Sequence, residues 1–201
     1  MGSTRAAILG VGSYSPRRVV TNADLEKLVD TSDEWISQRT GIRQRHLVED
    51  GQVTSDLAYE AAVKALERAE TDVSELDLIV VGTVTPDMPM PSTACFLQAK
   101  LGAPACTAFD LSAACAGFLY GLSVGEKFVR TGAAKRALVV GVEVLSRIVD
   151  WSDRNTCVLF GDGAGAVVLG PSPDPERGIL YVLEPLADED RSLVHMWRVG
   201  R

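Results

Sequence analysis

The chain has few of the residues that would tie it to a metal, a disulfide framework or a membrane. Its 201 residues include only four cysteines and two histidines, and the cysteines lack the close-pair spacings that zinc sites use. We therefore expect no bound metal and no disulfides, as is typical of a reducing cytoplasm. No apolar run approaches membrane-spanning length, and no charged segment followed by a hydrophobic run opens the chain. These absences predict a cytoplasmic protein without a membrane partner.

Basic residues are also too few for a nucleic-acid partner. Lysine and arginine number 20 against 27 acidic residues, which gives a formal net charge of −7. Nucleic-acid binding requires a basic surface, so we expect no nucleic acid among the partners. An acidic partner would have to dock on a local basic patch. The candidate clusters are Arg17, Arg18, Arg43 and Arg45, and Arg130, Lys135 and Arg136.

The hydrophobic residues, 46% of the chain, suffice for one sizeable core, and their pattern alternates between strand and helix. We expect strands over residues 5–11, 76–84, 106–111 and 136–142, a glycine-broken pair of strands within 157–169, and a further strand from Ile179. We expect helices over residues 22–29, 31–41, 54–69, 92–101 and 114–131. Three prolines make residues 85–91 a loop. Strands alternating with helices predict a layered α/β domain.

Cys115 is the most informative residue, because it lies where a predicted buried strand hands over to a helix. Unpaired amide N–H groups and the positive end of the helix dipole meet at such a point, and both favour a thiolate. The small residues Ala113, Ala114, Ala116 and Gly117 leave room for a second molecule. This pattern indicates a nucleophile. The alternative is a small buried hydrophobe, which is the ordinary role of a free cysteine.

Three further features allow both a functional and a structural interpretation. The segment Phe160–Leu169 resembles a phosphate loop but lacks Gly-Lys-Ser/Thr and continues as a strand, so we interpret it as a turn or bulge of close backbone approach. Trp35 and Arg39 share one helix face and could bind a purine with phosphates, or form an ordinary half-buried stack; Arg154 has the same ambiguity. His46 is interpreted as a structural histidine.

Five blocks of the sequence, in order between about Ile8 and Leu169, resemble β-ketoacyl-acyl carrier protein synthase III. They are Thr21–Glu26, Thr31–Ile36, Arg39–Arg43, Ala113–Phe118 and Phe160–Ala166. The resemblance implies a thiolase-like layered α/β/α fold built from two similar halves. Residues 1–183 would form the N-terminal half and residues 184–201 an unassigned tail, with the second half absent from this chain.

The resemblance also implies roles for individual residues. Cys115 would accept an acyl group from coenzyme A as a thioester. Trp35 and Arg154 would sandwich the adenine of coenzyme A. Met90 would reach across a homodimer toward the partner's acyl pocket. The implied coenzyme A contacts are Thr31, Trp35, Arg39 and Arg154.

The implied reaction condenses the acyl group with malonyl-acyl carrier protein to start fatty-acid synthesis, with coenzyme A thioester as substrate and no cofactor. The family's catalytic histidine and asparagine come from the second half, so we expect this chain to lack the condensation step. Two alternatives stay open. One is a related ketosynthase of polyketide or other specialised metabolism, and the other is a non-catalytic fragment that binds coenzyme A.

Overall fold

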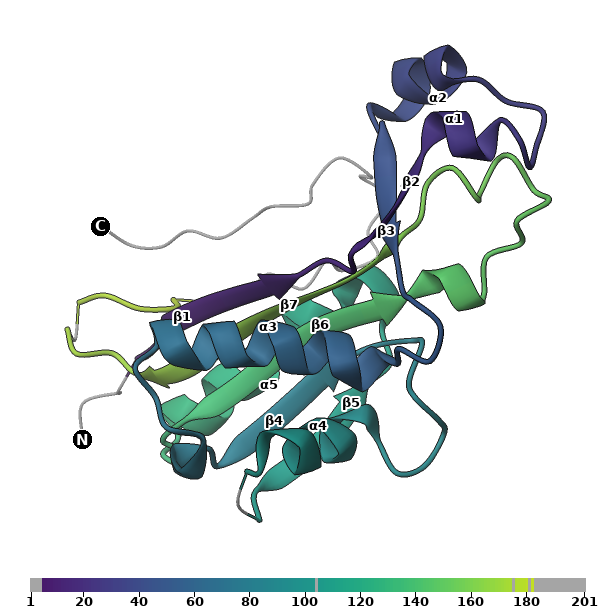
Figure 1. Ribbon diagram of the computed structural model, residues 1–201. Coiled ribbons are helices and arrows are strands. Elements are labelled where there is room, and N and C mark those ends of the chain that lie inside the picture. The colour runs from purple at the N-terminus through teal and green to yellow at the C-terminus, as the bar shows by residue number, and fades with distance from the viewer. Residues whose placement is uncertain (1–4, 104, 175, 181, 183–201) are drawn as a thin grey trace.

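A central mixed sheet organises the protein in a computed structural model that describes residues 5–103, 105–174, 176–180 and 182 (Figure 1). Its five strands lie in the order β1-β7-β6-β4-β5. β4 is parallel to β5 and β6, whereas β7 is antiparallel to β6 and β1. The strands are β1 (Ala6–Tyr14), β4 (Leu78–Gly82), β5 (Thr107–Leu111), β6 (Ala137–Val144) and β7 (Asp162–Pro171).

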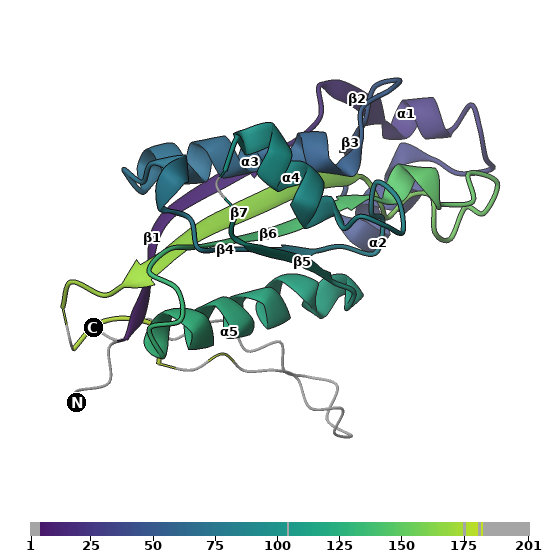
Figure 2. The ribbon, with the colours of Figure 1, turned by 90° about the horizontal axis from the view of Figure 1, so that it is seen from below.

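Helices cover both faces of this sheet, as Figure 2 shows. On one face lie α3 (Thr54–Arg68) and α4 (Thr93–Leu101), and on the other lies α5 (Gly117–Arg130). Alternate residues of β4 enter different cores: Ile79 packs in the α3 and α4 core, whereas Val80 packs in the α5 core. The predicted layered α/β fold is confirmed. So is the predicted apolar stripe of α3, which is fully buried at Leu57, Ala58, Ala61, Ala62 and Ala65.

A smaller lobe, formed by residues 18–47 and 145–161, lies at one end of the sheet (Figure 1). It contains an antiparallel pair, β2 (Arg18–Thr21) and β3 (Gln44–Leu47), and two short helices, α1 (Asn22–Leu25) and α2 (Asp33–Thr40). β6 runs straight into it through the 3-10 turn η3 (Leu145–Arg147). The lobe has its own core, which includes Val20, Leu25, Ile36, Leu47, Cys157 and Val158.

Three strand predictions need correction. β5 is not a buried strand. Among the residues that the structure describes, it pairs with β4 alone at the edge of the sheet, and each of its residues is at least partly exposed. The pair of strands expected within 157–169 is the single strand β7, which pairs continuously with β6 across its glycines. Ile179 makes a backbone bond to Ala6 (2.8 Å) without extending into a described strand. The tail 184–201 lies outside the described residues.

The helix boundaries are largely as predicted, with shifted caps. Ser32, not Thr31, caps α2, and its hydroxyl accepts the N–H of Trp35 (3.1 Å). Gly41 ends α2 in the left-handed conformation (φ +74°), as expected. α1 is shorter than predicted and is capped by Thr21 rather than Asn22, because the Asn22 side chain is buried and bonded to other segments. The pair β2 and β3 was not predicted.

β4 and α5 meet backbone to backbone at Gly82 and Gly117. A Cβ on Gly82 would lie 2.7 Å from the carbonyl carbon of Gly117, closer than real Cβ atoms come. A glycine at position 82 therefore allows the end of β4 to touch the start of α5. This contact lies two residues from Cys115.

Gly82→Ala should lower the free energy of unfolding by about 1–3 kcal/mol, because the added methyl group forces β4 and α5 apart. Urea denaturation measures the effect. The matched control is Gly165→Ala in β7, where no atom lies within 4 Å of an added Cβ. The control should be neutral or stabilising by up to about 1 kcal/mol. Equal stabilities of the two variants would contradict the close contact.

Candidate active site

Cys115 lies in the turn that joins β5 to α5. The helix predicted from residue 114 begins instead as a 3-10 turn, η2 (Ala114–Ala116), which runs into α5 at Gly117. Ala114 has φ +44°, a left-handed conformation that is uncommon for a residue with a Cβ. Backbone strain of this kind, held by its surroundings, is often found at functional sites. The start of α5 lies at the end of the sheet nearer to the smaller lobe (Figure 2).

The amide groups at this turn have no side-chain cap. Neither Ala113 before η2 nor Ala116 before α5 provides a hydrogen-bonding side chain. The first N–H groups of a helix have no partner within the helix and carry its partial positive charge. At this turn, however, the N–H of Ala116 donates to the carbonyl of Ala113 (3.0 Å) and that of Gly117 donates to the carbonyl of Ala114. What the turn places near Cys115 is therefore the positive end of the α5 dipole.

Neighbouring segments hold the turn in place. The N–H of Thr83 donates to the carbonyl of Leu111 at the end of β5 (3.0 Å). The Asp110 carboxylate accepts the N–H groups of Thr93 (2.7 Å) and Ala94 (2.8 Å) at the start of α4. Asp110 on β5 thus caps α4. The end of β5 is therefore hydrogen-bonded both to α4 and to Thr83, the residue after β4.

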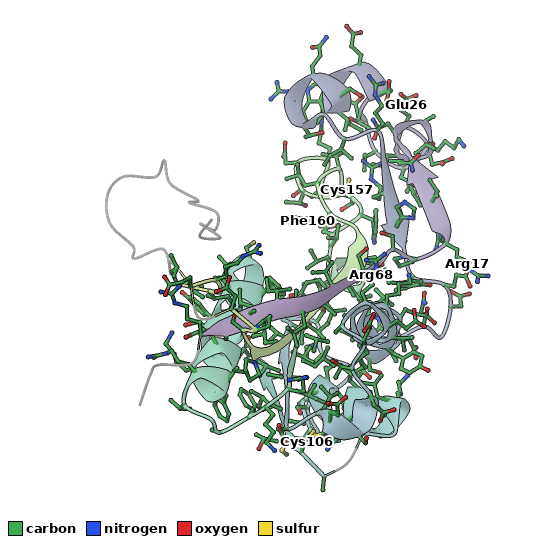
Figure 3. The ribbon with its side chains drawn as sticks, turned by 90° about the vertical axis from the view of Figure 1, so that its left-hand side faces the viewer. Arg17, Glu26, Arg68, Cys106, Cys157 and Phe160 are labelled. Carbon is green, nitrogen blue, oxygen red and sulfur yellow. The ribbon has the colours of Figure 1, made fainter. Side chains whose placement is uncertain are left out.

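The four cysteines differ in exposure. Cys115 is exposed, Cys95 and Cys106 are half-buried, and Cys157 is buried. Figure 3 shows Cys157 within the smaller lobe, whereas Cys106 lies at the opposite end of the molecule. Burial raises the pKa of the Cys106 and Cys157 thiols. The structural interpretation of a free cysteine, as a small buried hydrophobe, therefore suits Cys157 and does not suit Cys115.

The structure brings Trp35, Arg39 and Arg154 together. The guanidinium carbon of Arg39 lies 4.7 Å from the centroid of the Trp35 ring, and that of Arg154 lies 4.3 Å from it. The predicted stack of Trp35 with Arg39 is present, and Arg154 joins it from the distant segment 145–161. Because Arg154 already lies on the indole, a base can enter between them only if the two side chains separate.

Two polar atoms beside this stack are buried without a hydrogen-bond partner among the described residues: Thr31 Oγ1 and Arg154 Nε. Arg154 also forms an ion pair with Asp30 (3.7 Å), whose side chain is fully exposed, and such surface pairs contribute little. Unpaired buried polar atoms are uncommon in proteins and costly. The group can therefore offer hydrogen bonds to a ligand.

A buried arginine fixes segment 145–161 against the rest of the smaller lobe. Arg45 is 5% exposed, so it does not belong to the basic surface cluster in which we placed it. Its guanidinium donates to the carbonyls of Val20 (3.3 Å) and Val158 (3.1 Å) and to Asn22 Oδ1 (2.9 Å). Burial lowers the pKa of Arg45. One side chain thus joins β2, β3, α1 and the segment that carries Arg154.

The hydrogen bonds continue from there to the helix of Trp35. The Asn22 amide group donates to Asp33 Oδ1 (2.7 Å) in the first turn of α2. Trp35 follows two residues later. A continuous chain therefore connects the two segments that meet at the tryptophan.

The interpretation of the glycine-rich segment holds only at its first glycine, Gly161, because Gly163 and Gly165 lie in the regular strand β7, which pairs with β6 without a turn or bulge. A Cβ on Gly161 would lie 3.0 Å from Cβ of Arg45 and 3.1 Å from the carbonyl oxygen of His46. The next residue, Asp162, accepts the N–H of Val48 (2.8 Å) and both the N–H (2.9 Å) and hydroxyl (2.6 Å) of Ser146. Sequence reasoning missed this role of Asp162. His46 lies with Nδ1 2.6 Å from the carbonyl oxygen of Pro16, in the structural role expected of it.

Met90 lies on the loop of residues 83–92, between β4 and α4, and is 83% exposed. Met88 on the same loop is 45% exposed. Two large apolar side chains exposed on one loop could be buried by contact with another chain. The predicted reach of Met90 toward a partner chain stays a prediction.

A cavity of about 520 Å³ lies beside the smaller lobe, lined by parts of β2 and β3, residues 48–52 and residues 146, 147 and 151. Its lining includes neither Cys115 nor Trp35. Among the residues that the structure describes, no group of three or more His, Cys, Asp or Glu could hold a metal ion. Over the same residues, no helix has the length and apolar character needed to cross a membrane.

Sequence and fold both match known proteins. Residues 109–183 match the family model of 3-oxoacyl-[acyl-carrier-protein] synthase III. A β-ketoacyl-[acyl-carrier-protein] synthase III of Xylella fastidiosa is 64% identical over 175 residues, which are 87% of this chain and 53% of that protein. The crystal structure of 3-oxoacyl-[acyl-carrier-protein] synthase III from Aquifex aeolicus has a TM-score of 0.84 at 52% identity, over 87% of this chain and 56% of that one.

The likeness extends to a second class of enzyme. The priming β-ketosynthase from the R1128 polyketide biosynthetic pathway has a TM-score of 0.83 at 42% identity, over 89% of this chain and 55% of that one. The chain spans about half the length of the relatives that it matches.

Iodoacetamide should alkylate Cys115 before the other cysteines at neutral pH. Cys115 is exposed, whereas a raised pKa means that Cys106 and Cys157 form thiolate only at more alkaline pH. Peptide mapping by mass spectrometry, from neutral to alkaline pH, measures each rate. Cys115→Ser should remove the fast phase. Labelling of Cys106 or Cys157 as fast as Cys115 at neutral pH would contradict this order.

Proposed function

Because the chain belongs in sequence and fold to the 3-oxoacyl-[acyl-carrier-protein] synthase III family, with its thiolase-like α/β fold, we propose that the protein is an acyltransferase and condensing enzyme that starts fatty-acid synthesis. The observation that carries the proposal is the exposed thiol of Cys115 in a strained turn at the start of α5. Cys115 is the nucleophile in this proposal.

In the first step, the sulfur of Cys115 attacks the carbonyl carbon of an acyl-coenzyme A thioester. A new C–S bond to Cys115 forms and the C–S bond to coenzyme A breaks, while the thiol proton passes to the departing coenzyme A. Negative charge develops on the carbonyl oxygen during the attack. The position of Cys115 at the start of α5 supports this step, since the positive end of a helix dipole stabilises such charge.

The coenzyme A moiety binds at the smaller lobe in this proposal. Its adenine enters between Trp35 and Arg154 once the two side chains separate, and Arg39 and Thr31 contact coenzyme A nearby. The unpaired Thr31 Oγ1 and Arg154 Nε supply hydrogen bonds.

In the second step, malonyl-acyl carrier protein loses carbon dioxide and its carbanion attacks the Cys115 thioester. A C–C bond forms and the Cys115 thiolate is released. We assign this step to the whole protein, in which a homodimer uses Met90 at the partner's acyl pocket, in the cytoplasm. The exposure of Met88 and Met90 supports a covered loop.

A second candidate is the priming ketosynthase of a polyketide pathway. The likeness to the R1128 enzyme favours it, and it would use the same Cys115 chemistry with a different acyl group. A non-catalytic fragment that binds coenzyme A is the remaining alternative, and it would leave Cys115 unmodified.

Incubation with acetyl-coenzyme A should add one acetyl group to each chain, on Cys115. The exposed thiol exchanges with the thioester, and Cys115→Ser removes the nucleophile. Intact-mass spectrometry with peptide mapping measures the product. Cys95→Ser serves as the control and should still be acetylated. A folded sample that takes up no acetyl group, or takes it up on another cysteine, would rule out the proposed first step.

Trp35→Ala and Arg154→Ala should each weaken coenzyme A binding about tenfold or more, since stacking of a base is worth roughly 1–3 kcal/mol. Titration calorimetry of each variant with coenzyme A measures the change. Gln38→Ala, an exposed position on the same helix as Trp35, is the control and should bind like the unsubstituted protein. If all three variants bind alike, coenzyme A binds elsewhere.

A further inference from the structure

Glu143, near the end of β6, gathers three hydrogen-bond donors from the start of the 83–92 loop. Its Oε1 accepts the N–H of Val84 (2.9 Å). Its Oε2 accepts the hydroxyl of Thr83 (3.3 Å) and, in a short contact, the hydroxyl of Thr85. Thr83 and Thr85 are buried. A single carboxylate thus fixes three consecutive residues.

The two hydroxyl groups also accept hydrogen bonds in this arrangement. Thr83 Oγ1 accepts the N–H of Thr85 (3.1 Å), and Thr85 Oγ1 accepts the N–H of Val144 (2.8 Å). The two hydroxyl oxygens lie 3.5 Å from each other, and Glu143 Oε2 is the nearer acceptor for the proton of each. Since an ionised carboxylate only accepts hydrogen bonds, it suits three donors, whereas an amide would turn an NH₂ group toward at least one of them.

The start of this loop lies directly against the turn of Cys115. The N–H of Thr83 donates to the carbonyl of Leu111, four residues before Cys115. Gly82, the residue before the loop, touches the backbone of Gly117. Thr83 is therefore held by Glu143 on one side and by the end of β5, just before the Cys115 turn, on the other.

The far side of the loop has separate anchors on α3. Thr54 Oγ1 donates to the carbonyl of Thr85 (2.5 Å), and the N–H of Ser55 donates to Asp87 Oδ1 (2.8 Å). Removing the Glu143 carboxylate would leave these anchors in place. The expected change is thus a local shift of the loop rather than loss of the fold.

We propose that Glu143 is a positioning residue whose carboxylate sets the place of the 83–92 loop beside Cys115, and through it the rate of acyl transfer. The inference rests on the proposed function for its effect on acyl transfer. The fixing of the loop by Glu143 rests only on the hydrogen bonds of Thr83, Val84 and Thr85 to its carboxylate. Small displacements at a reacting centre have large effects on rate, so a fixed loop start matters even though Glu143 does not touch the thiol.

The test compares Glu143→Gln and Thr85→Val with two controls. Thr85→Ser keeps the hydroxyl, and Glu126→Gln neutralises a buried carboxylate on α5 whose partners are Lys127 and Arg130. Amide hydrogen exchange of residues 83–92 reports the loop. Acetylation of Cys115 across a range of acetyl-coenzyme A concentrations separates the maximal rate from the half-saturating concentration.

Glu143→Gln and Thr85→Val should speed exchange in the 83–92 loop and lower the maximal acetylation rate about tenfold. The half-saturating concentration should stay unchanged, because the Trp35 stack is untouched. Both controls should behave like the unsubstituted protein. A structural role without positioning would lower the melting temperature while the folded protein kept its full rate.

Unchanged exchange in Glu143→Gln overturns the proposal, as does faster exchange with an unchanged acetylation rate. If the unsubstituted protein takes up no acetyl group, the proposed function fails. The positioning role of Glu143 is then tested by the rate at which iodoacetamide alkylates Cys115. A change of about threefold or more in that rate for Glu143→Gln, absent in Glu126→Gln, then supports the positioning role. Equal alkylation rates overturn it.

Discussion

The contact between Gly82 and Gly117 is the constraint on which the candidate active site depends. It brings the end of a strand buried on both faces against the first turn of α5, backbone to backbone. In the residues that follow, the N–H of Thr83 donates to the carbonyl of Leu111, and the N–H of Val84 donates to Glu143 at the start of the 83–92 loop. Because β4 is an interior strand, paired with β6 and β5 and buried along its length, it ties the turn of Cys115 to the core. A strained backbone at Ala114 can persist only in such a setting.

The smaller lobe depends on a different kind of interaction. Two strands of four residues are marginal on their own, and the lobe core is small. Polar side chains add hydrogen bonds between its segments. Arg45 joins β2, α1 and segment 145–161, while Asp162 joins Val48, the residue after β3, to η3. Such buried groups are costly when they lose their partners, and Arg45 Nε already has none among the described residues. Each of these side chains therefore favours the one arrangement of the lobe in which its other hydrogen bonds form.

Local patterns in the sequence predicted the parts of the fold that local forces decide. The apolar run of β4, the stripe of α3 and the turn at Cys115 could be found because neighbouring residues determine them. The roles of Glu143, Asp162 and Arg45 could not, since their partners lie far away along the chain and no spacing rule links them. From the sequence we even predicted that Arg45 lies in a basic surface cluster. Its burial follows from three acceptors that the fold, not the sequence pattern, assembles around it.

The Trp35 stack shows how a site can be closed and still suited to a ligand. An arginine over an aromatic ring gains about 0.5–2 kcal/mol, more when it is desolvated, and a base stacked on an aromatic side chain gains about 1–3 kcal/mol. Arg154 is half-buried, so a base competes with it for the indole on similar terms. The displaced guanidinium would also free its unpaired Nε, and Thr31 Oγ1 lacks a partner as well, so a polar ligand would satisfy atoms that the protein leaves unsatisfied. In this structure Arg154 occupies the face of the indole that a base would use.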